Sequence, residues 1–236
     1  MDNDVINYCF SILNDDSSLD DINKTQIVLI PQIKGPKQIT HFRFISLCNV
    51  IYKIALEVLV NRFKSDLSKC IRENQSAFVP GRLITNNVLV AYEIDPHPKT
   101  KKEREKRFLT LKLDMNKAYD QVERKFLKEI MKKLGIHPKW ITTNMKCVSS
   151  VSYSLVINGS ITNKFHPGRG LRQRDPLSPY LFLIYTQGLS ALLAQDQRNG
   201  LLQGMQACRS GPRVSHLFFA DDNMVFLKAN TSEGRR

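Results

Sequence analysis

Three aspartates in this sequence stand where apolar segments end, and their type and spacing suit metal-dependent chemistry. Asp221 and Asp222 lie between two short apolar runs, and Asp114 closes the partly alternating segment Phe108–Asp114. An isolated Asp-Asp pair indicates a surface turn, because turns favour aspartate. A third carboxylate at the end of a separate strand favours a different interpretation. Converging carboxylates suit Mg²⁺, and two-metal phosphoryl or nucleotidyl transfer needs such a cluster.

The spacing of apolar residues predicts the elements that must position these aspartates. Strands are predicted at residues 26–33, 108–114, 151–157, 217–220 and 224–227. Helices are predicted at residues 51–71, 85–93, 122–134 and 175–193. Asp120 and Asp175 are the expected N-caps of the last two helices, and Gly135 is the expected C-terminal stop of the third. The two C-terminal strands form a hairpin with the Asp-Asp pair at its tip.

Composition and charge narrow the class of protein. The 236 residues are 42% hydrophobic and 24% charged, which is typical of a folded protein. The net charge of +13 favours a polyanionic partner, with nucleic acid first and an anionic membrane second. The five scattered cysteines include no Cys-x-x-Cys pair, so we expect thiols in a reducing compartment and no zinc site. No apolar run is long enough to span a bilayer, and the acidic start lacks a secretory pattern. The basic stretch 95–107 is expected to be a solvated loop.

Five segments, in order, resemble the motifs of reverse transcriptases. Leu113–Asp120 is similar to the first catalytic motif and Phe219–Asp222 to the second, while Arg169–Phe182 resembles the template-and-nucleotide motif between them. Upstream, Phe42–Asn49 and Gln75–Arg82 resemble fingers segments of LINE-type, non-LTR retrotransposon enzymes, notably those of plants. The resemblance extends from about Asn23 to Leu227, nearly the whole chain.

The resemblance implies an α+β fold, the fingers and palm of a right-hand polymerase, with an antiparallel palm sheet backed by helices. The expected segments are an N-terminal lead-in at 1–22, a fingers-like segment at 23–107, a palm-like catalytic segment at 108–227 and a tail at 228–236. A thumb and the end of the palm are not expected within the chain, so we expect poor polymerisation by it alone. The palm hairpin would also lack sheet neighbours and leave an edge exposed.

The resemblance also implies roles for individual residues. Asp114, Asp221 and Asp222 would be catalytic and would hold two Mg²⁺ ions, with Mn²⁺ as an alternative. The implied nucleotide-binding residues are Arg43, Tyr119, Gln173, Ser178 and Pro179. The implied nucleic-acid-binding residues are Lys34, Lys37, Arg82, Arg169 and Arg172. The implied partners are an RNA template, a DNA primer and deoxynucleoside triphosphates, without a membrane. An active enzyme of this kind would work inside the cell, in the nucleus.

Two positions depart from the family pattern and leave other functions open. Phe44 stands where the family has proline, and Arg174 stands where it has glycine. Glycine permits close backbone approach and unusual dihedral angles, so Arg174 could obstruct the nucleotide site. One alternative is therefore a catalytically inactive remnant that binds nucleic acid through its basic surface. A reverse transcriptase of the intron maturase type is the other alternative.

Overall fold

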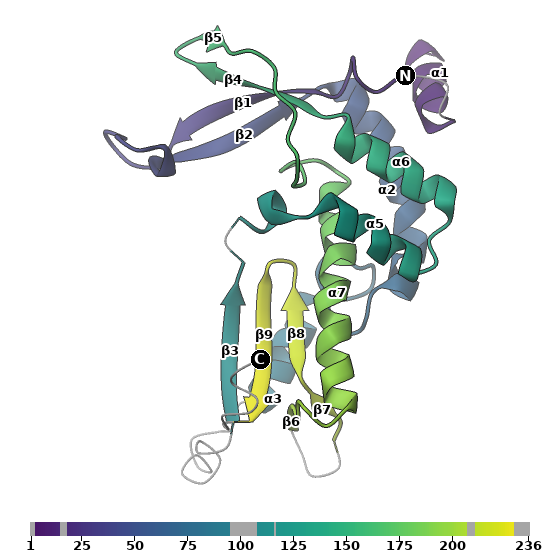
Figure 1. Cartoon of the computed structure of the whole chain (residues 1–236), viewed down its shortest axis with the longest axis vertical. Helices are drawn as coiled ribbons and strands as arrows, with labels where there is room; N and C mark the ends of the chain where they lie inside the picture. Colours follow the sequence, from purple (N-terminus) through teal and green to yellow (C-terminus); the bar gives the residue numbers. More distant parts are fainter. Residues whose placement is uncertain (1–2, 15–17, 95–107, 116, 207–210, 229–236) are drawn as a thin grey trace. The chain divides into compact units, whose positions relative to one another are not determined.

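The computed structural model describes residues 3–14, 18–94, 108–115, 117–206 and 211–228, and its chain packs into two compact units (Figure 1). Unit 1 comprises residues 1–63 and 119–181, and unit 2 comprises residues 64–118 and 182–236. Helices and strands occur in both units, which confirms the α+β class. Each unit takes chain from both sides of residue 107, so the predicted functional division into fingers-like and palm-like segments stays a prediction. The predicted basic loop at 95–107 lies outside the described residues.

Unit 1 contains a four-stranded sheet in the order β2-β1-β4-β5. Its strands are β1 (Lys24–Pro31), β2 (Phe42–Cys48), β4 (Ser152–Ile157) and β5 (Ser160–Ile161). β1 pairs antiparallel with β2 and parallel with β4, a parallel pairing that strand spacing alone did not predict. Asn158 and Gly159 both have positive φ, 50° and 81°, as a two-residue type I′ hairpin between β4 and β5 requires.

Helices complete unit 1. They are α1 (Asn3–Leu13), η1 (Ile39–His41), the first part of α2 (Val50–Cys70), most of η3 (Ala118–Gln121), α5 (Arg124–Lys133) and α6 (Pro138–Ser149). Apolar side chains of α2 and α5 are fully buried, among them Tyr52, Leu56, Leu127 and Met131. Burial of this kind contributes roughly 1.5–3 kcal/mol per large apolar side chain, so these residues form the main support of the unit.

Unit 2 is built around a three-stranded antiparallel sheet in the order β3-β9-β8. Its elements are α3 (Ile84–Ile94), β3 (Phe108–Asp114), most of α7 (Ser178–Arg198), β6 (Met205–Gln206), β7 (Arg213–Val214), β8 (His216–Phe219) and β9 (Asp222–Lys228). Phe226 and Leu217 pack with Ile94 of α3, whereas Val225 and Leu227 of β9 pack with Leu193 of α7. α3 therefore packs against one face of the antiparallel sheet, and α7 contacts the other face at β9; Figure 1 shows α3 behind the sheet and α7 beside β8.

Two predicted helix starts were wrong. α5 begins at Arg124 with Glu123 as N-cap, and Asp120 instead lies in the short helix η3. α7 begins at Ser178 and not at Asp175; the Asp175 carboxylate accepts a hydrogen bond from the Leu177 amide in the turn that precedes the helix. The stop at Gly135 is confirmed. With φ at +74°, the Gly135 amide donates to Lys132 and the next amide donates to Met131, which is a Schellman motif.

Four of the five cysteines lie among the described residues, and all four are free thiols; they are Cys9, Cys48, Cys70 and Cys147. Cys208 lies outside the described residues. Of the helices that the structure describes, none is both long enough and apolar enough to cross a membrane.

Candidate functional site

The three aspartates meet at one end of the unit 2 sheet. Asp114, the last residue of β3, lies directly opposite Asp222, the first residue of β9. Such partners have Cβ atoms about 4.5–5.5 Å apart. Phe219 pairs with Asp222 across the β8–β9 hairpin, which leaves Ala220 and Asp221 as a two-residue loop. All three aspartates are exposed. The backbone therefore presents three carboxylates to solvent from two neighbouring strands and the loop between β8 and β9.

The loop that contains Asp221 has an unusual backbone. Ala220 has φ of +53°, whereas Asp221 does not have positive φ. Positive φ at only the first loop position is the pattern of a type II′ hairpin turn, where glycine is normally found. The loop is held by its neighbours, since the Ala220 amide donates to Gln75 Oε1 at 3.2 Å and Asn223 Nδ2 donates to the Asp221 carbonyl at 3.3 Å.

Lysine modifies the electrostatics of this cluster. Lys112 Nζ lies 3.2 Å from Asp222 Oδ1, and the two side chains are 65% and 61% exposed. Exposed ion pairs of this kind contribute about 0–1 kcal/mol, so a cation could displace Lys112 at small cost. In the described part of the chain, no three His, Cys, Asp or Glu side chains are gathered closely enough to hold a metal ion. Mg²⁺ needs only one or two protein carboxylates, however, and the exposed oxygen donors of this cluster fit that requirement.

Two motifs expected to bind the nucleotide pack together within unit 1. The Leu171 amide donates to the Tyr119 carbonyl at 2.8 Å, and Gln173 Nε2 reaches Asp120 Oδ1 at 3.5 Å. Gly170 permits this contact. It has φ of +85°, and a Cβ added there would lie 3.0 Å from the Asp120 carbonyl oxygen. The structure thus brings Tyr119 and Gln173, predicted from separate motifs, onto adjoining segments.

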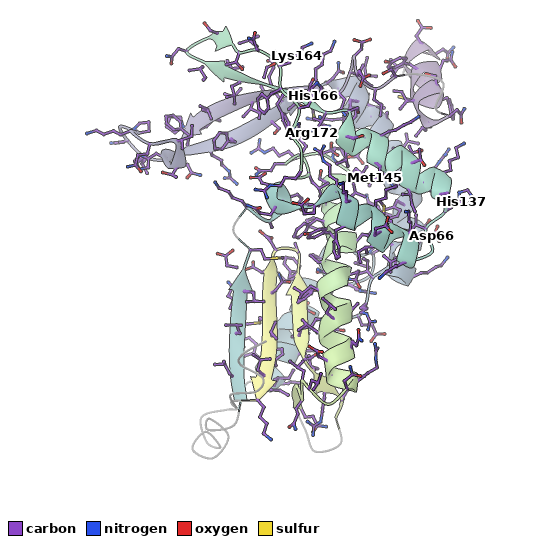
Figure 2. The ribbon with its side chains drawn as sticks, viewed as in Figure 1. Asp66, His137, Met145, Lys164, His166 and Arg172 are labelled. Atoms are coloured by element: carbon purple, nitrogen blue, oxygen red, sulfur yellow. The ribbon has the colours of Figure 1, made fainter. Side chains whose placement is uncertain are left out.

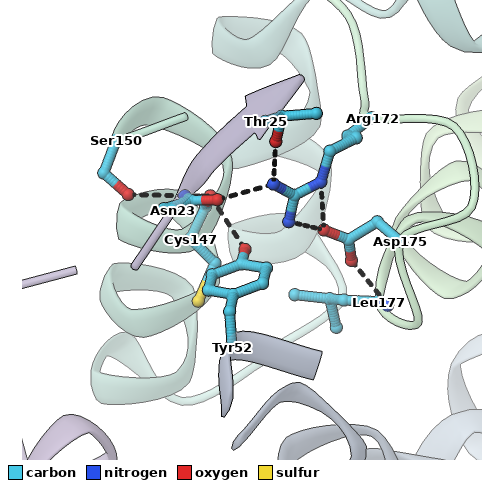
Figure 3. Close-up of polar contacts among 8 residues, drawn as sticks. All are labelled: Asn23, Thr25, Tyr52, Cys147, Ser150, Arg172, Asp175 and Leu177. Atoms are coloured by element: carbon cyan, nitrogen blue, oxygen red, sulfur yellow. Dashed lines mark hydrogen bonds and ion pairs between the residues drawn. The ribbon is translucent and has the colours of Figure 1, made fainter. Parts of the chain in front are cut away.

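Arg172 lies in the interior of unit 1 (Figure 2), where its guanidinium is the centre of a polar network (Figure 3). Its side chain is 3% exposed and pairs with Asp175. It also donates to Asn23 Oδ1 and Thr25 Oγ1, both at 2.7 Å, and lies 4.4 Å from the centroid of the Tyr52 ring. Because its donors are engaged inside the unit, this geometry assigns Arg172 a structural role in place of the expected contact with nucleic acid.

The other predicted binding residues fall into two groups: side chains that are buried or hydrogen-bonded within the protein, and side chains that are exposed. Ser178 is buried at the start of α7, and the Pro179 that follows is half-buried. Arg82, in unit 2, donates to the carbonyls of Ile71, Arg72 and Gln75, so it ties the backbone together. The exposed basic residues of the predicted set all belong to unit 1 and are Lys34, Lys37, Arg43 and Arg169.

Sequence reasoning missed the residues that support these sites. Asn23 Nδ2 donates to the Cys147 carbonyl and to Ser150, in addition to the bond from Arg172. Gln75 was identified only as the first residue of a fingers motif, and Lys112 only as part of a predicted strand. Their spacing from the aspartates gave no signal, because each reaches its partner through long-range strand pairing and not through local sequence.

Comparisons with known proteins identify the family of this chain. The family described as Reverse transcriptase (RNA-dependent DNA polymerase) matches residues 33–235. An uncharacterized mitochondrial protein of Arabidopsis thaliana is 49% identical over 67 residues, 28% of this chain and 55% of that protein. The Transposon TX1 uncharacterized 149 kDa protein of Xenopus laevis is 29% identical over 82% of this chain and 14% of its own length.

A retrotransposon protein and a solved structure extend the likeness. The Pol polyprotein from the type-1 retrotransposable element R2 of Popillia japonica is 29% identical over 56% of this chain and 21% of its own length. Apo telomerase from Candida tropicalis has the same fold, with a TM-score of 0.58 at 13% identity over 93% of this chain and 46% of that one. This chain thus spans only a small part of the transposon proteins and about half of the telomerase. It belongs to the reverse transcriptase family and is a reverse transcriptase domain of the non-LTR retrotransposon type.

Proposed function

We propose that this chain forms fingers and palm elements of a right-hand polymerase that adds deoxynucleotides to a primer 3′-hydroxyl on an RNA template. The observation that supports this most directly is the ladder position of Asp114 opposite Asp222, beside the loop that bears Asp221. Two bound Mg²⁺ ions, or Mn²⁺ in their place, would activate the primer hydroxyl and stabilise the leaving pyrophosphate. Each ion would be held by one or two of the carboxylates of Asp114, Asp221 and Asp222, and Asp222 would first release Lys112.

Other residues of the chain would position the substrates. Tyr119 would crowd the sugar of the incoming nucleotide and exclude a 2′-hydroxyl, while Gln173 on the adjoining segment would contact the new base pair. Pro179 and Ser178 would support that segment from the start of α7. Arg43 would contact the triphosphate, because a guanidinium suits forked recognition of phosphate oxygens. The exposed Lys34, Lys37 and Arg169 would bind the nucleic-acid backbone.

Primer extension tests this proposal. The chain should extend a DNA primer on an RNA template in Mg²⁺, at a rate set by how well it places the reactants, because correct placement supplies about 7–11 kcal/mol of such a barrier. Asp221→Asn should abolish the product, whereas Asp66→Asn, which alters an exposed carboxylate of α2, should leave it unchanged. Extension that survives Asp221→Asn would contradict the assignment.

A second candidate is a remnant that binds nucleic acid without chemistry. The observation that favours it is Arg174, which adopts φ of +62° where the family has glycine. A remnant of this kind would bind RNA and primer–template duplex in a salt-dependent way, and it would give no extension even when a related enzyme's C-terminal portion is supplied together with Arg174→Gly. Extension restored by that combination, and lost again with Asp221→Asn, would favour the polymerase.

A further inference from the structure

Residues 74–76 extend the unit 2 sheet by pairing with β8 along the edge of β8 that does not face β9. The Phe218 amide donates to the Asn74 carbonyl at 2.7 Å, and the Ser76 amide donates to the Phe218 carbonyl at 3.2 Å. Gln75 and Phe218 consequently form a parallel bridge. All of these residues belong to unit 2. The bridge brings Gln75, which is far from the aspartates in sequence, beside the loop that bears Asp221.

The Gln75 side chain is buried and accepts two hydrogen bonds from backbone amides. It is 1% exposed, and its Oε1 accepts from the Ala77 amide at 3.0 Å and from the Ala220 amide at 3.2 Å. Both partners are N–H donors, so the end of the amide group that faces them must be the oxygen. One acceptor atom therefore joins the strand-like segment 74–77 to the first residue of the loop.

The loop needs such a restraint. Ala220 is a non-glycine residue with φ of +53° and is 7% exposed, so its backbone is strained and its amide is shielded from water. A strained conformation persists only where its surroundings determine it. Without the Gln75 oxygen, the buried Ala220 amide would lose its partner, and the loop could relax to a conformation that turns Asp221 elsewhere.

The other end of the Gln75 amide suggests that stability is not its only role. Gln75 Nε2 is buried and has no hydrogen-bond partner among the described residues. A buried donor without a partner is unfavourable, and a side chain selected for packing alone would avoid it. The acceptor function at the loop accounts for an amide at this position.

We propose that Gln75 is a positioning residue for the metal-binding carboxylates, acting through the Ala220 amide on the orientation of Asp221. This inference rests on the proposed function, since it concerns the same cluster. Replacing a residue that hydrogen-bonds to a metal ligand and orients it commonly lowers metal affinity by about 10–100-fold. Gln75→Met keeps the length of the side chain and removes the acceptor, so it should weaken Mn²⁺ binding by about tenfold.

Asn87 provides a matched control. Its Nδ2 donates to the Phe218 carbonyl at 2.8 Å, on the same strand but not at the loop. Asn87→Leu removes a side-chain bond to β8 and should change Mn²⁺ affinity less than about twofold, within the scatter expected for a residue that does not orient a ligand. Gln75→Glu, which retains an acceptor oxygen, should recover part of the affinity lost in Gln75→Met.

The experiment is a Mn²⁺ titration of the full chain and of these variants. The electron paramagnetic resonance signal measures free Mn²⁺, and circular dichroism confirms that each protein is folded. Hydrogen exchange of the Ala220 amide is measured in parallel and should accelerate in Gln75→Met but not in Asn87→Leu. Wild-type binding that Asp221→Asn does not weaken would overturn the proposed function. Equal Mn²⁺ affinity of Gln75→Met and the wild type would overturn the role of Gln75. If the wild-type chain binds no Mn²⁺, an unchanged rate of hydrogen exchange at the Ala220 amide in Gln75→Met would also overturn the role of Gln75.

Discussion

At the scale of single residues, the backbone of Arg174 explains why a glycine belongs at this position in the family pattern. Its φ of +62° lies in the left-handed region, where a side chain costs about 1–2 kcal/mol. The segment around it is held in place, since Arg172, two residues before, and Asp175, the next residue, are paired in the interior. The position therefore keeps its conformation whatever residue occupies it, and arginine stays under strain there.

We expect Arg174→Gly to raise the free energy of unfolding by about 1 kcal/mol, because it removes this strain. Urea denaturation followed by circular dichroism measures the change. Arg169→Gly is the control, since Arg169 does not have positive φ; a glycine there adds freedom to the unfolded chain and removes only an exposed ion pair with Glu123 at 3.9 Å. A destabilised Arg174→Gly variant would show that the Arg174 side chain makes contacts that outweigh the strain.

His216 should make stability depend on pH. It is 1% exposed on β8, with Ser190 Oγ 2.8 Å from its Nε2 and Ser215 Oγ 2.9 Å from its Nδ1. Burial, with a smaller contribution from Arg72, lowers the pKa of His216 from 6.5 to about 4. The folded state thus disfavours the charged imidazole. The contribution of neutral His216 to the free energy of unfolding is therefore complete above pH 6.5 and is lost as the pH falls towards 4.

Between pH 7 and pH 5 this histidine should reduce the free energy of unfolding by about 2 kcal/mol. Urea denaturation at a series of pH values measures the slope. His216→Gln cannot be protonated in this range, so its stability should fall less over the same interval. Identical slopes for the two proteins would exclude His216 as the source.

At the scale of elements, the sequence predicted those whose signals are local. The Asn158-Gly159 turn and the Gly135 stop follow from backbone preferences of the residues themselves, and both were confirmed. Asp120 and Asp175 were wrong as helix caps: Asp120 lies in η3 against a distant segment, and Asp175 lies in a turn that precedes α7. Asp175 binds Arg172, and Asp120 lies against the Gly170 segment. The parallel pairing of β1 with β4 joins residues far apart in the chain, so no local pattern could reveal it.

The contact between the Tyr119 and Gln173 segments should depend on Gly170. Gly170→Ala adds a Cβ that meets the Asp120 backbone at 3.0 Å, in addition to the strain of φ at +85°. Gly159→Ala is a matched control with φ of +81° and nothing within 4 Å of the added Cβ. We expect Gly170→Ala to lower the free energy of unfolding by about 1 kcal/mol more than Gly159→Ala, measured by urea denaturation. Equal losses would mean that the segments separate without cost.

At the scale of the whole molecule, the sequence predicted the family and the place of the aspartates better than the roles of basic residues. Strand ends and turn chemistry placed Asp114 and the Asp-Asp pair on strands that the structure pairs directly. Arginine is different, because the same side chain can bind phosphate or satisfy buried carbonyls. Only the structure separates Arg172 and Arg82, whose guanidinium groups are engaged internally, from the exposed Arg43.

The net charge of +13 should make binding of RNA or primer–template duplex steeply salt-dependent and nearly independent of sequence. Each side chain that neutralises a phosphate contributes about 0.7–0.9 to the slope of log affinity against log salt. Arg43→Gln and Lys37→Gln, both at exposed positions of unit 1, should each reduce the slope by about that amount. Lys69→Gln is the control, because Lys69 already pairs with Asp66 at 2.7 Å. Titration at several salt concentrations measures the slopes. A wild-type slope near zero, or equal slopes for all four proteins, would mean that these basic residues do not bind the nucleic-acid backbone.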